Sequence, residues 1–347
     1  MPLPMADREL AQAQWAAGAV RLSGYPKVCS ARHLVILWQN QHDRQMKRSF
    51  ARLTAVGLLV ATLYSPARGQ ESRGQQFVAD AARRLDSETS IAAELRYRAQ
   101  AFGHQVLGTG SYLQSGAGMA RQLRLELRMQ VGDKPATLQE IRGPEDYWMR
   151  RDVPPSEPTL RRVDLLQLRR ALRGDQPTGE EVLPRGAWIM LGGLPRLLAT
   201  LEQSFDFAAP RAEEVQLSGA GGQPNPLPIW VVEGHWKPAR LAALTGGSQS
   251  TNNLPEQMPD RVEIVLDRSD KILPLFPYRI SYWRTPPKKK SERTAPPALE
   301  LLTLEMFNVR RAGAIDAREF EYNPGDQEVL DLTTAYIQHL GGGKKPR

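Results

Sequence analysis

Cysteine is almost missing from this sequence of 347 residues, and its single copy is Cys29. Beyond that position the chain can form no disulfide, offers no thiolate nucleophile and has no cysteine-based metal site. It also lacks the cysteine that a lipobox would need for a lipid anchor. A cysteine-free chain is compatible with an oxidising compartment, where free thiols are rare.

The sequence also lacks recognisable catalytic and metal-binding motifs. Beyond residue 69 there are three histidines, His104, His235 and His339, and no two have the spacing of a zinc site. The chain has no G-x-S-x-G elbow and no phosphate-binding P-loop, and the glycine pairs at 108–110 and 219–222 are interpreted as turns. The sequence therefore predicts no catalytic residues, no metal and no cofactor, and a protein that is not an enzyme.

Neighbouring carboxylates do occur, but next to Gly or Pro or in turn-like surroundings. A general acid needs an apolar wall that raises its pKa, and no pair has one in the sequence. We interpret them as solvated surface groups. The pairs are Glu145-Asp146, Glu180-Glu181 and Glu213-Glu214.

The positive net charge of +8 is concentrated in the first part of the chain. Residues 1–69 contain 9 basic and 3 acidic residues, which leaves 37 basic and 35 acidic residues in the remainder. A nearly neutral remainder argues against nucleic acid as a partner. One basic run, Lys288-Lys289-Lys290, lies between proline pairs and is interpreted as a solvated loop.

Residues 46–69 have the pattern of a secretory signal peptide. Met46-Lys47-Arg48 gives a basic start, residues 53–63 form a short apolar run, and Ala67-Arg68-Gly69 supplies small residues for cleavage. The alternatives are an uncleaved membrane anchor and a buried helix. The apolar run has about half of the ~20 residues that a membrane-spanning helix needs, which argues against the anchor. We predict that residues 1–45 are a start-site misannotation and disordered, that the protein is periplasmic or exported and soluble after cleavage, and that residues 338–347 form a disordered tail.

Between residues 74 and 309, helical and strand patterns alternate in blocks. A helix at 74–86 precedes strands in which apolar and polar residues alternate, as they do from Leu123 to Val131. Such alternation indicates an antiparallel sheet with one apolar face. Strands are predicted at 91–100, 106–113, 123–131, 137–141, 147–150, 215–217, 229–233, 261–267, 277–283 and 299–309.

The middle of the chain is predicted to be helical, at 163–172 and 194–205. Leu194, Leu197, Leu198, Leu201 and Phe205 share one helix face, after a start signal of two glycines and a proline. The fold class is therefore α+β, with helices gathered on one face of a large antiparallel sheet that curves around them.

Aromatic residues are the remaining feature of note. Five tryptophans lie beyond residue 69, and we weigh two interpretations for them: ordinary sheet core, or the lining of an apolar pocket for acyl chains. They are Trp148, Trp188, Trp230, Trp236 and Trp283.

A short helix, a long meander with Arg124 in its third strand, and Tyr147-Trp148 after Gly143-Pro144 resemble the periplasmic outer-membrane lipoprotein carriers, the LolA-like family. Phe320-Glu-Tyr322-Asn-Pro324 followed by Asp331-Leu-Thr333 is similar to the closing segment of that family. The resemblance covers roughly residues 74–337, and it assigns residues 70–337 to one LolA-like lipid-binding domain.

The resemblance implies an incomplete, strongly curved β-barrel closed by helices, with acyl chains of a lipoprotein or lipid in the cavity. It also implies an arginine that holds the lid closed by hydrogen bonds. Arg124 is the nearest candidate, with Arg121 and Arg128 as competitors, although strict alternation turns Arg124 away from Leu123 and Leu125 unless a bulge intervenes. The cavity candidates are Leu95, Tyr97, Leu123, Leu125, Leu127, Met129, Trp148, Leu194, Leu198 and Leu201.

Two functions follow, and an enzyme of unknown type is a third alternative, which a cleft that joined His104, His235 and carboxylates would favour. The first is a monomeric, non-enzymatic carrier of acyl chains, which exchanges its cargo with membrane-associated donor and acceptor proteins. The second is a periplasmic protein-interaction or sensor module of the same fold, whose core is filled by its own side chains. The two differ in whether side chains alone fill the space between the helix at 194–205 and the sheet.

Overall fold

The computed structural model describes residues 72–101, 104–154, 156–173, 188–215, 226–248, 250–251, 254–269, 273–286 and 296–340. The predicted signal peptide, the segment before it and the Lys288–Lys290 loop lie outside these residues. Within the described part, thirteen strands form one sheet in the order β13-β6-β5-β4-β3-β2-β1-β12-β11-β10-β9-β7, with β8 paired to β9. All pairs are antiparallel except β13 with β6.

The first half of the chain supplies one helix, a six-stranded meander and a second helix. The α3 helix begins where the Ser72 hydroxyl accepts a hydrogen bond from the backbone N–H of Gln75, an ordinary helix N-cap. The bounds are α3 (Arg73–Ser87), β1 (Ser90–Ala101), β2 (His104–Ser115), η1 (Gly118–Ala120), β3 (Gln122–Val131), β4 (Lys134–Arg142), β5 (Asp146–Asp152), β6 (Thr159–Asp164) and α4 (Leu165–Arg173).

The second half contributes the remaining helices and the other side of the sheet. The α6 helix has Gly193 at its N-cap and Pro195 in its first turn, as the sequence predicts. The bounds are α5 (Trp188–Leu191), α6 (Leu194–Ser204), β7 (Phe205–Phe207), β8 (Arg211–Val215), β9 (Leu227–Trp236), α7 (Pro238–Thr245), β10 (Arg261–Asp267), β11 (Pro277–Arg284), β12 (Leu299–Arg310), η3 (Ala317–Phe320), β13 (Val329–Asp331) and α8 (Thr333–Leu340).

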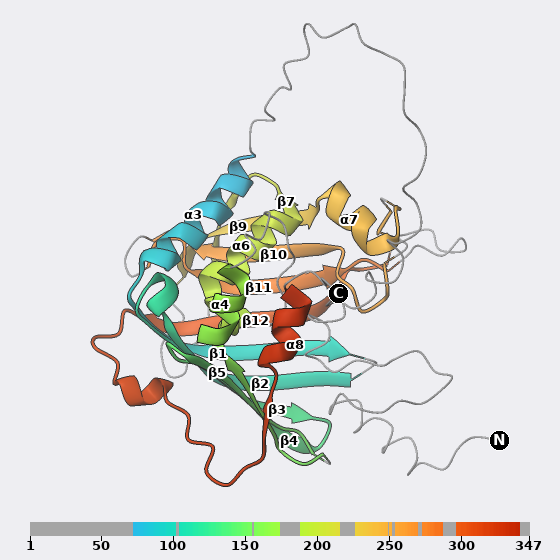
Figure 1. Ribbon diagram of the computed structural model, residues 1–347. Helices are drawn as coiled ribbons and strands as arrows, with labels where there is room; N and C mark the ends of the chain where they lie inside the picture. The colour runs from blue at the N-terminus through green and yellow to red at the C-terminus, as the bar shows by residue number, and fades with distance from the viewer. Residues whose placement is uncertain are drawn as a thin grey trace, which may run out of the picture.

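The predicted fold class is confirmed. The sheet curves around a group of helices, and α3, α6, α4 and α8 lie on the same side of it (Figure 1). Its two ends, β13 and β7, stay apart in the order of the strands, so the described sheet is open. The face toward the helices carries the main apolar core, and we call it the inner face.

Three local predictions differ from the structure, and one helix was not predicted. Val163 and Asp164 belong to β6, because their alternation continues the strand before α4 begins. Gly108 and Gly110 lie within β2 and form no turn. The helix α8 extends into residues assigned to the tail, and α7 forms where no helix or strand is predicted.

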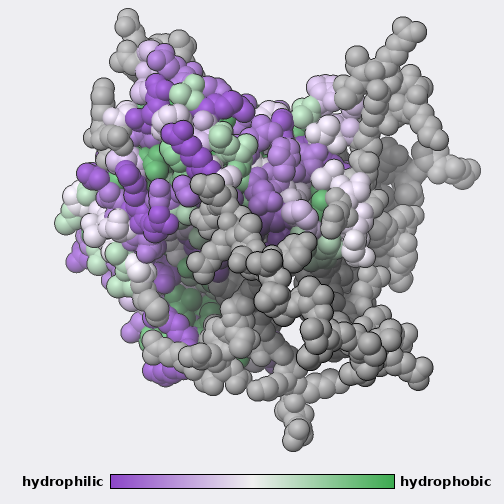
Figure 2. Space-filling model, turned by 90° about the horizontal axis from the view of Figure 1, so that it is seen from above, coloured by the Kyte–Doolittle hydropathy of each residue, from purple (hydrophilic) through white to green (hydrophobic). Residues whose placement is uncertain are grey.

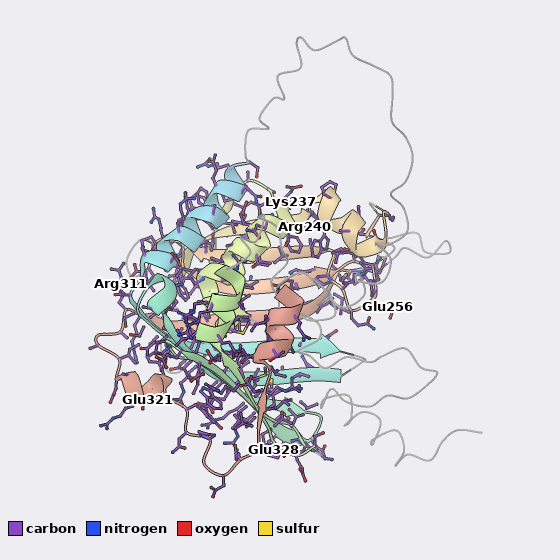
Figure 3. All side chains as sticks on the ribbon, viewed as in Figure 1. Lys237, Arg240, Glu256, Arg311, Glu321 and Glu328 are labelled. Atoms are coloured by element: carbon purple, nitrogen blue, oxygen red, sulfur yellow. The ribbon has the colours of Figure 1, made fainter. Side chains whose placement is uncertain are left out.

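The face of the molecule that is seen from above is largely hydrophilic. Seen from above, hydrophilic side chains cover most of the described surface, with smaller hydrophobic patches (Figure 2). Charged side chains such as Arg311, Glu256 and Glu328 lie at the periphery (Figure 3). In the described part of the chain, no helix is both long and apolar enough to cross a membrane.

Candidate functional site

Apolar side chains from the sheet and from α6 meet on the inner face. Seven of the ten predicted cavity residues belong to one cluster there, and none of the seven is more than 5% exposed. Alternation along β1 and β3 turns every second residue inward, and the helical stripe of α6 faces them. The seven are Leu95, Leu123, Leu125, Leu127, Leu194, Leu198 and Leu201.

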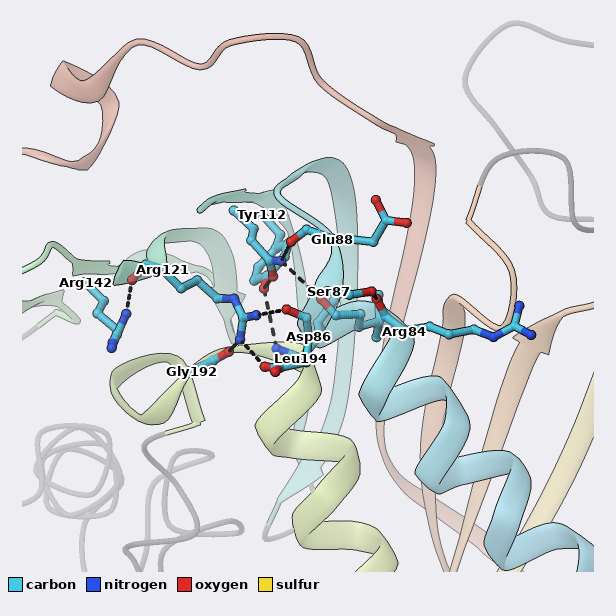
Figure 4. Close-up of polar contacts among 11 residues, drawn as sticks. Arg84, Asp86, Ser87, Glu88, Tyr112, Arg121, Arg142, Gly192 and Leu194 are labelled. Carbon is cyan, nitrogen blue, oxygen red and sulfur yellow. Dashed lines mark hydrogen bonds and ion pairs between the residues drawn. The ribbon is translucent and has the colours of Figure 1, made fainter. Parts of the chain in front are cut away.

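Arg121 joins the helices to the strands. It stands between η1 and β3, and only 2% of its surface is exposed. Its Nη1 donates to the carbonyl oxygen of Gly192 at 3.0 Å, and its Nη2 donates to the carbonyl oxygen of Asp86 at 2.7 Å. The Asp86 carboxylate lies 3.0 Å from Nη1 and supplies the opposite charge (Figure 4). One buried guanidinium therefore ties the end of α3 and the turn before α6 to the meander.

A second buried arginine supports the first. Arg142, on the inner face of β4, donates from Nε to the carbonyl oxygen of Met190 in α5 at 3.0 Å and also donates to the carbonyl oxygen of Arg121. Burial, with smaller contributions from Arg169 and Arg121, lowers the pKa of Arg142 to about 10. Burial of the charged guanidinium is unfavourable, and its hydrogen bonds to carbonyl oxygens near the helix end offset part of that loss.

Tyr112 completes the contact with the turn. The backbone N–H of Leu194 donates to its hydroxyl oxygen at 3.4 Å, and the hydroxyl donates to Oε1 of Gln114 at 2.9 Å. A Cβ at Gly193, where φ is +79°, would lie 2.6 Å from the same hydroxyl oxygen. We call Arg121, Arg142, Tyr112 and the Gly192–Gly193 turn the latch.

Two predicted residues lie on the outer face. Arg124 donates to the carbonyl oxygen and the carboxylate of Glu319 in η3, at 3.1 and 3.2 Å, and the register of β3 shows no bulge. Trp148 stacks on Tyr322 with 5.4 Å between ring centroids. Both side chains contact the C-terminal segment as it crosses the outside of the meander. Arg128 is exposed and pairs with Glu126.

The remaining two predicted cavity residues, Tyr97 and Met129, lie at the other end of the inner face. With Tyr282 they contact a small cluster formed by Ala99, Val106 and Leu302. Burial raises the pKa of both Tyr97 and Tyr282, yet both side chains keep part of their surface exposed. Among the described residues, neither hydroxyl makes a hydrogen bond. We call this region the tyrosine end.

Among the described residues there is no cluster of His, Cys, Asp and Glu that could hold a metal ion. His235 is exposed and lies 3.2 Å from Glu233. Asp146, from one of the carboxylate pairs, forms an ion pair with Arg162 at 2.7 Å.

The sequence pointed to Arg121 only as a competitor, and neither Arg142 nor Tyr282 was among the predicted site residues. The inward direction of Arg142 could have been predicted from the sequence. Arg142 lies four residues after Leu138 in the same strand, so the two side chains share one face of the sheet. The same alternation places Tyr282 two residues from Ile280 on the inner face. The hydrogen bonds of Arg121 had no signal, since its partners are backbone carbonyls from distant segments.

The fold and the site define an α+β protein whose open, curved sheet encloses a helical layer over an apolar face. No protein-family model and no curated protein matches the sequence. The solved structures that are similar at low scores include three for which the comparison covers 72% of this chain. They are a DUF1329 family protein from Desulfovibrio piger (11% identity, TM-score 0.30, 96% of that chain), a putative outer membrane lipoprotein-sorting protein domain from Vibrio parahaemolyticus (9%, 0.27, 96%) and a LolA superfamily protein from Nitrosomonas europaea (12%, 0.24, 97%).

Proposed function

We propose that this protein is a non-enzymatic carrier that binds acyl chains of a lipid or lipoprotein on the inner face of its sheet. The observation that carries the proposal is the partial burial of the Tyr97 and Tyr282 side chains among apolar residues. Each is enclosed deeply enough for its pKa to rise, and each nevertheless keeps exposed surface. The side chains around them are apolar, which is the setting that an acyl chain needs.

The rest of the inner face supplies a larger apolar surface that the helices cover. Cargo with long acyl chains would extend from the tyrosine end beneath α6, where Leu194, Leu198 and Leu201 now contact the strand leucines. Entry then requires α5 and α6 to move away from the sheet. The latch sets the free-energy difference between the closed and open forms, because its hydrogen bonds join those helices to the meander.

The alternative is a protein-interaction or sensor module whose core is filled. The burial of the α6 stripe favours it, since Leu194 and Leu198 have no exposed surface. In that case the helices would remain closed, and the outer face with its C-terminal segment would contact the partner. Both functions fit an exported protein, which the predicted signal peptide at residues 46–69 suggests.

Mass spectrometry tests the choice directly. The chain from Met46 onward would be exported, purified from the periplasm, and analysed first in its native state and then after lipid extraction. The carrier proposal expects a mature N-terminus near Gln70 and a stoichiometric lipid or acylated peptide. A folded protein with no bound lipid, which also fails to take up lipid in vitro, would favour the filled-core alternative.

A further inference from the structure

The tyrosine end contains two polar atoms in an otherwise apolar setting. Tyr97 lies opposite Leu304 in the pairing of β1 with β12, and Tyr282 lies opposite Leu302 in the pairing of β11 with β12. The two tyrosines therefore flank β12 from either side on the inner face. Their backbones are two strand spacings apart, or about 10 Å across the sheet.

The hydroxyl groups have no hydrogen-bond partner among the described residues. The other described side chains of this cluster, from Ala99, Val106, Met129, Val131 and Leu302, offer no oxygen or nitrogen. Both side chains keep part of their surface exposed, so water can hydrate the hydroxyl groups in the unliganded protein. A ligand that covered this region without an acceptor would leave each donor unpaired, which is unfavourable by roughly 1–3 kcal/mol. A ligand that supplies an acceptor to each hydroxyl would remove that penalty.

The chemistry of the surroundings selects the acceptor. Loss of hydration raises the pKa of both tyrosines, so both remain neutral donors at physiological pH. The same loss of hydration disfavours a carboxylate or phosphate beside them. A neutral ester carbonyl accepts hydrogen bonds and carries no charge to desolvate.

We infer that Tyr97 and Tyr282 are the polar anchors of this site and that their hydroxyl groups donate hydrogen bonds to the ester carbonyls of a neutral acylated glycerol. The inference rests on the proposed acyl-binding function and adds to it a selection for esters. The apolar walls then contact the chains next to the esters, while the longer part of each chain extends beneath α6.

The test compares two ligands with the same chains. Dioleoylglycerol has two ester carbonyls, and the dioleyl ether of glycerol has none. The wild-type protein is expected to bind the ester about tenfold more tightly, a preference that two hydrogen bonds of ordinary net strength supply. In the double variant Tyr97→Phe/Tyr282→Phe the preference should fall to about one, because the ether makes the same apolar contacts.

A matched control separates the hydroxyl groups from general effects on the sheet. Tyr278 lies on the same face of β11, four residues before Tyr282, and is also buried. Tyr278→Phe should keep the preference for the ester. The substitutions at Tyr97 and Tyr282 should leave the folded state intact, since each removes a hydroxyl without a described partner. Thermal unfolding of each variant checks this.

The outcomes divide cleanly. Equal binding of ester and ether by the wild-type protein, or a preference that persists in the double variant, overturns the anchor role and leaves the carrier proposal standing. Binding of neither ligand by the wild-type protein removes the carrier proposal itself. As a second comparison, methyl oleate should bind more tightly than oleate, and the reverse order would contradict selection for a neutral ester.

Discussion

The guanidinium of Arg121 donates a 3.0 Å hydrogen bond to the carbonyl oxygen of Gly192, a residue 71 positions further along the chain. The contact joins the start of β3 to the turn that leads into α6 (Figure 4). Because Gly193 follows Gly192 directly and α6 begins at Leu194, movement of this turn changes the direction in which α6 leaves it. Arg121 is therefore in a position to control whether the helix lies on the sheet.

Arg121→Met should destabilise the closed form. The substitution leaves the carbonyl groups of Gly192 and Asp86 without their donor inside the protein, at a loss of roughly 2–4 kcal/mol. Hydrogen–deuterium exchange should rise across α5 and α6, and lipid exchange should become faster if the carrier proposal holds. Urea unfolding and exchange mass spectrometry measure the two effects.

Arg124→Met is the matched control for this experiment. Arg124 is three residues away but on the outer face, where it pairs with Glu319 and Glu126 in partly exposed ion pairs. Such pairs contribute about 0–1 kcal/mol, so stability and exchange of α6 should change little. A larger effect on α6 from Arg124→Met than from Arg121→Met would contradict the assignment of the latch.

Gly193→Ala tests the close approach between the turn and the meander. Its φ of +79° disfavours any side chain, and the added Cβ would lie 2.6 Å from the Tyr112 hydroxyl oxygen. We expect a loss of about 2–3 kcal/mol, from strain together with displacement of Tyr112. Gly118→Ala has a positive φ of +56° with nothing within 4 Å, so it should lose only about 1 kcal/mol. Equal losses in the two variants would mean that contact with Tyr112 is unimportant.

The local patterns in the sequence predicted much of this fold. Alternation in Leu123–Val131 and the stripe from Leu194 to Phe205 both identify the faces that become buried. These signals are local, because a strand turns every second residue the same way and a helix repeats every 3.6 residues. The start of α6 was equally readable from Gly193 and Pro195.

The contacts of the latch could not be predicted in the same way. Arg121 has few local features that distinguish it from Arg124 or Arg128, and its partners are main-chain carbonyls of Asp86 and Gly192. Which arginine becomes buried depends on where the helices settle on the sheet. The parallel pairing of β13 with β6 was also missed, since three residues give too short a pattern.

Trp148→Ala should loosen the C-terminal segment. Trp148 stacks on Tyr322, and the Arg162 guanidinium lies 5.8 Å from the Trp148 ring centroid. Loss of the ring should destabilise by about 1–2 kcal/mol and raise hydrogen exchange in residues 317–331. Lipid binding should be unaffected, because the ring is on the outer face. A loss of lipid binding with a stable C-terminal segment would instead return Trp148 to the cavity.

Stability should fall as the pH rises above about 10. Burial raises the pKa of four tyrosines, Tyr278 to about 12, whereas an unfolded tyrosine titrates near its ordinary value of 10.0. Above pH 10 the tyrosines of the unfolded chain lose their protons before those of the folded protein. The buried tyrosines therefore contribute fully to stability below pH 10, and this contribution is lost as the pH rises. Burial lowers the pKa of Arg142, Arg196 and Arg284, which acts in the opposite direction, but these are three groups against four. The four are Tyr97, Tyr112, Tyr278 and Tyr282.

Urea unfolding between about pH 8 and pH 11 measures this dependence. Tyr97→Phe/Tyr282→Phe should make the decline shallower, because two of the four groups no longer titrate. A stability that stays constant through this range, while tyrosinate absorbance shows the residues ionising in the folded protein, would contradict the burial of these hydroxyl groups.

Leu198→Asp decides between the carrier and the filled core. Leu198 has no exposed surface and faces the strand leucines, so a carboxylate there is unfavourable by several kcal/mol while the helix remains on the sheet. A carrier has an alternative, since its helices can leave the sheet and carry the charge into water. It should therefore stay folded by circular dichroism and lose lipid binding. A filled core has no such alternative and should unfold.

Gln203→Asp is the control on the same helix, because Gln203 is exposed and an aspartate there is solvated. It should keep both fold and binding in either case. A folded Leu198→Asp variant that still binds lipid would exclude both models, because acyl chains would then bind somewhere other than beneath α6. If Leu198→Asp unfolds, the sheet needs its contacts with α6 to stay folded. A helix that leaves the sheet to admit cargo could not be needed in this way.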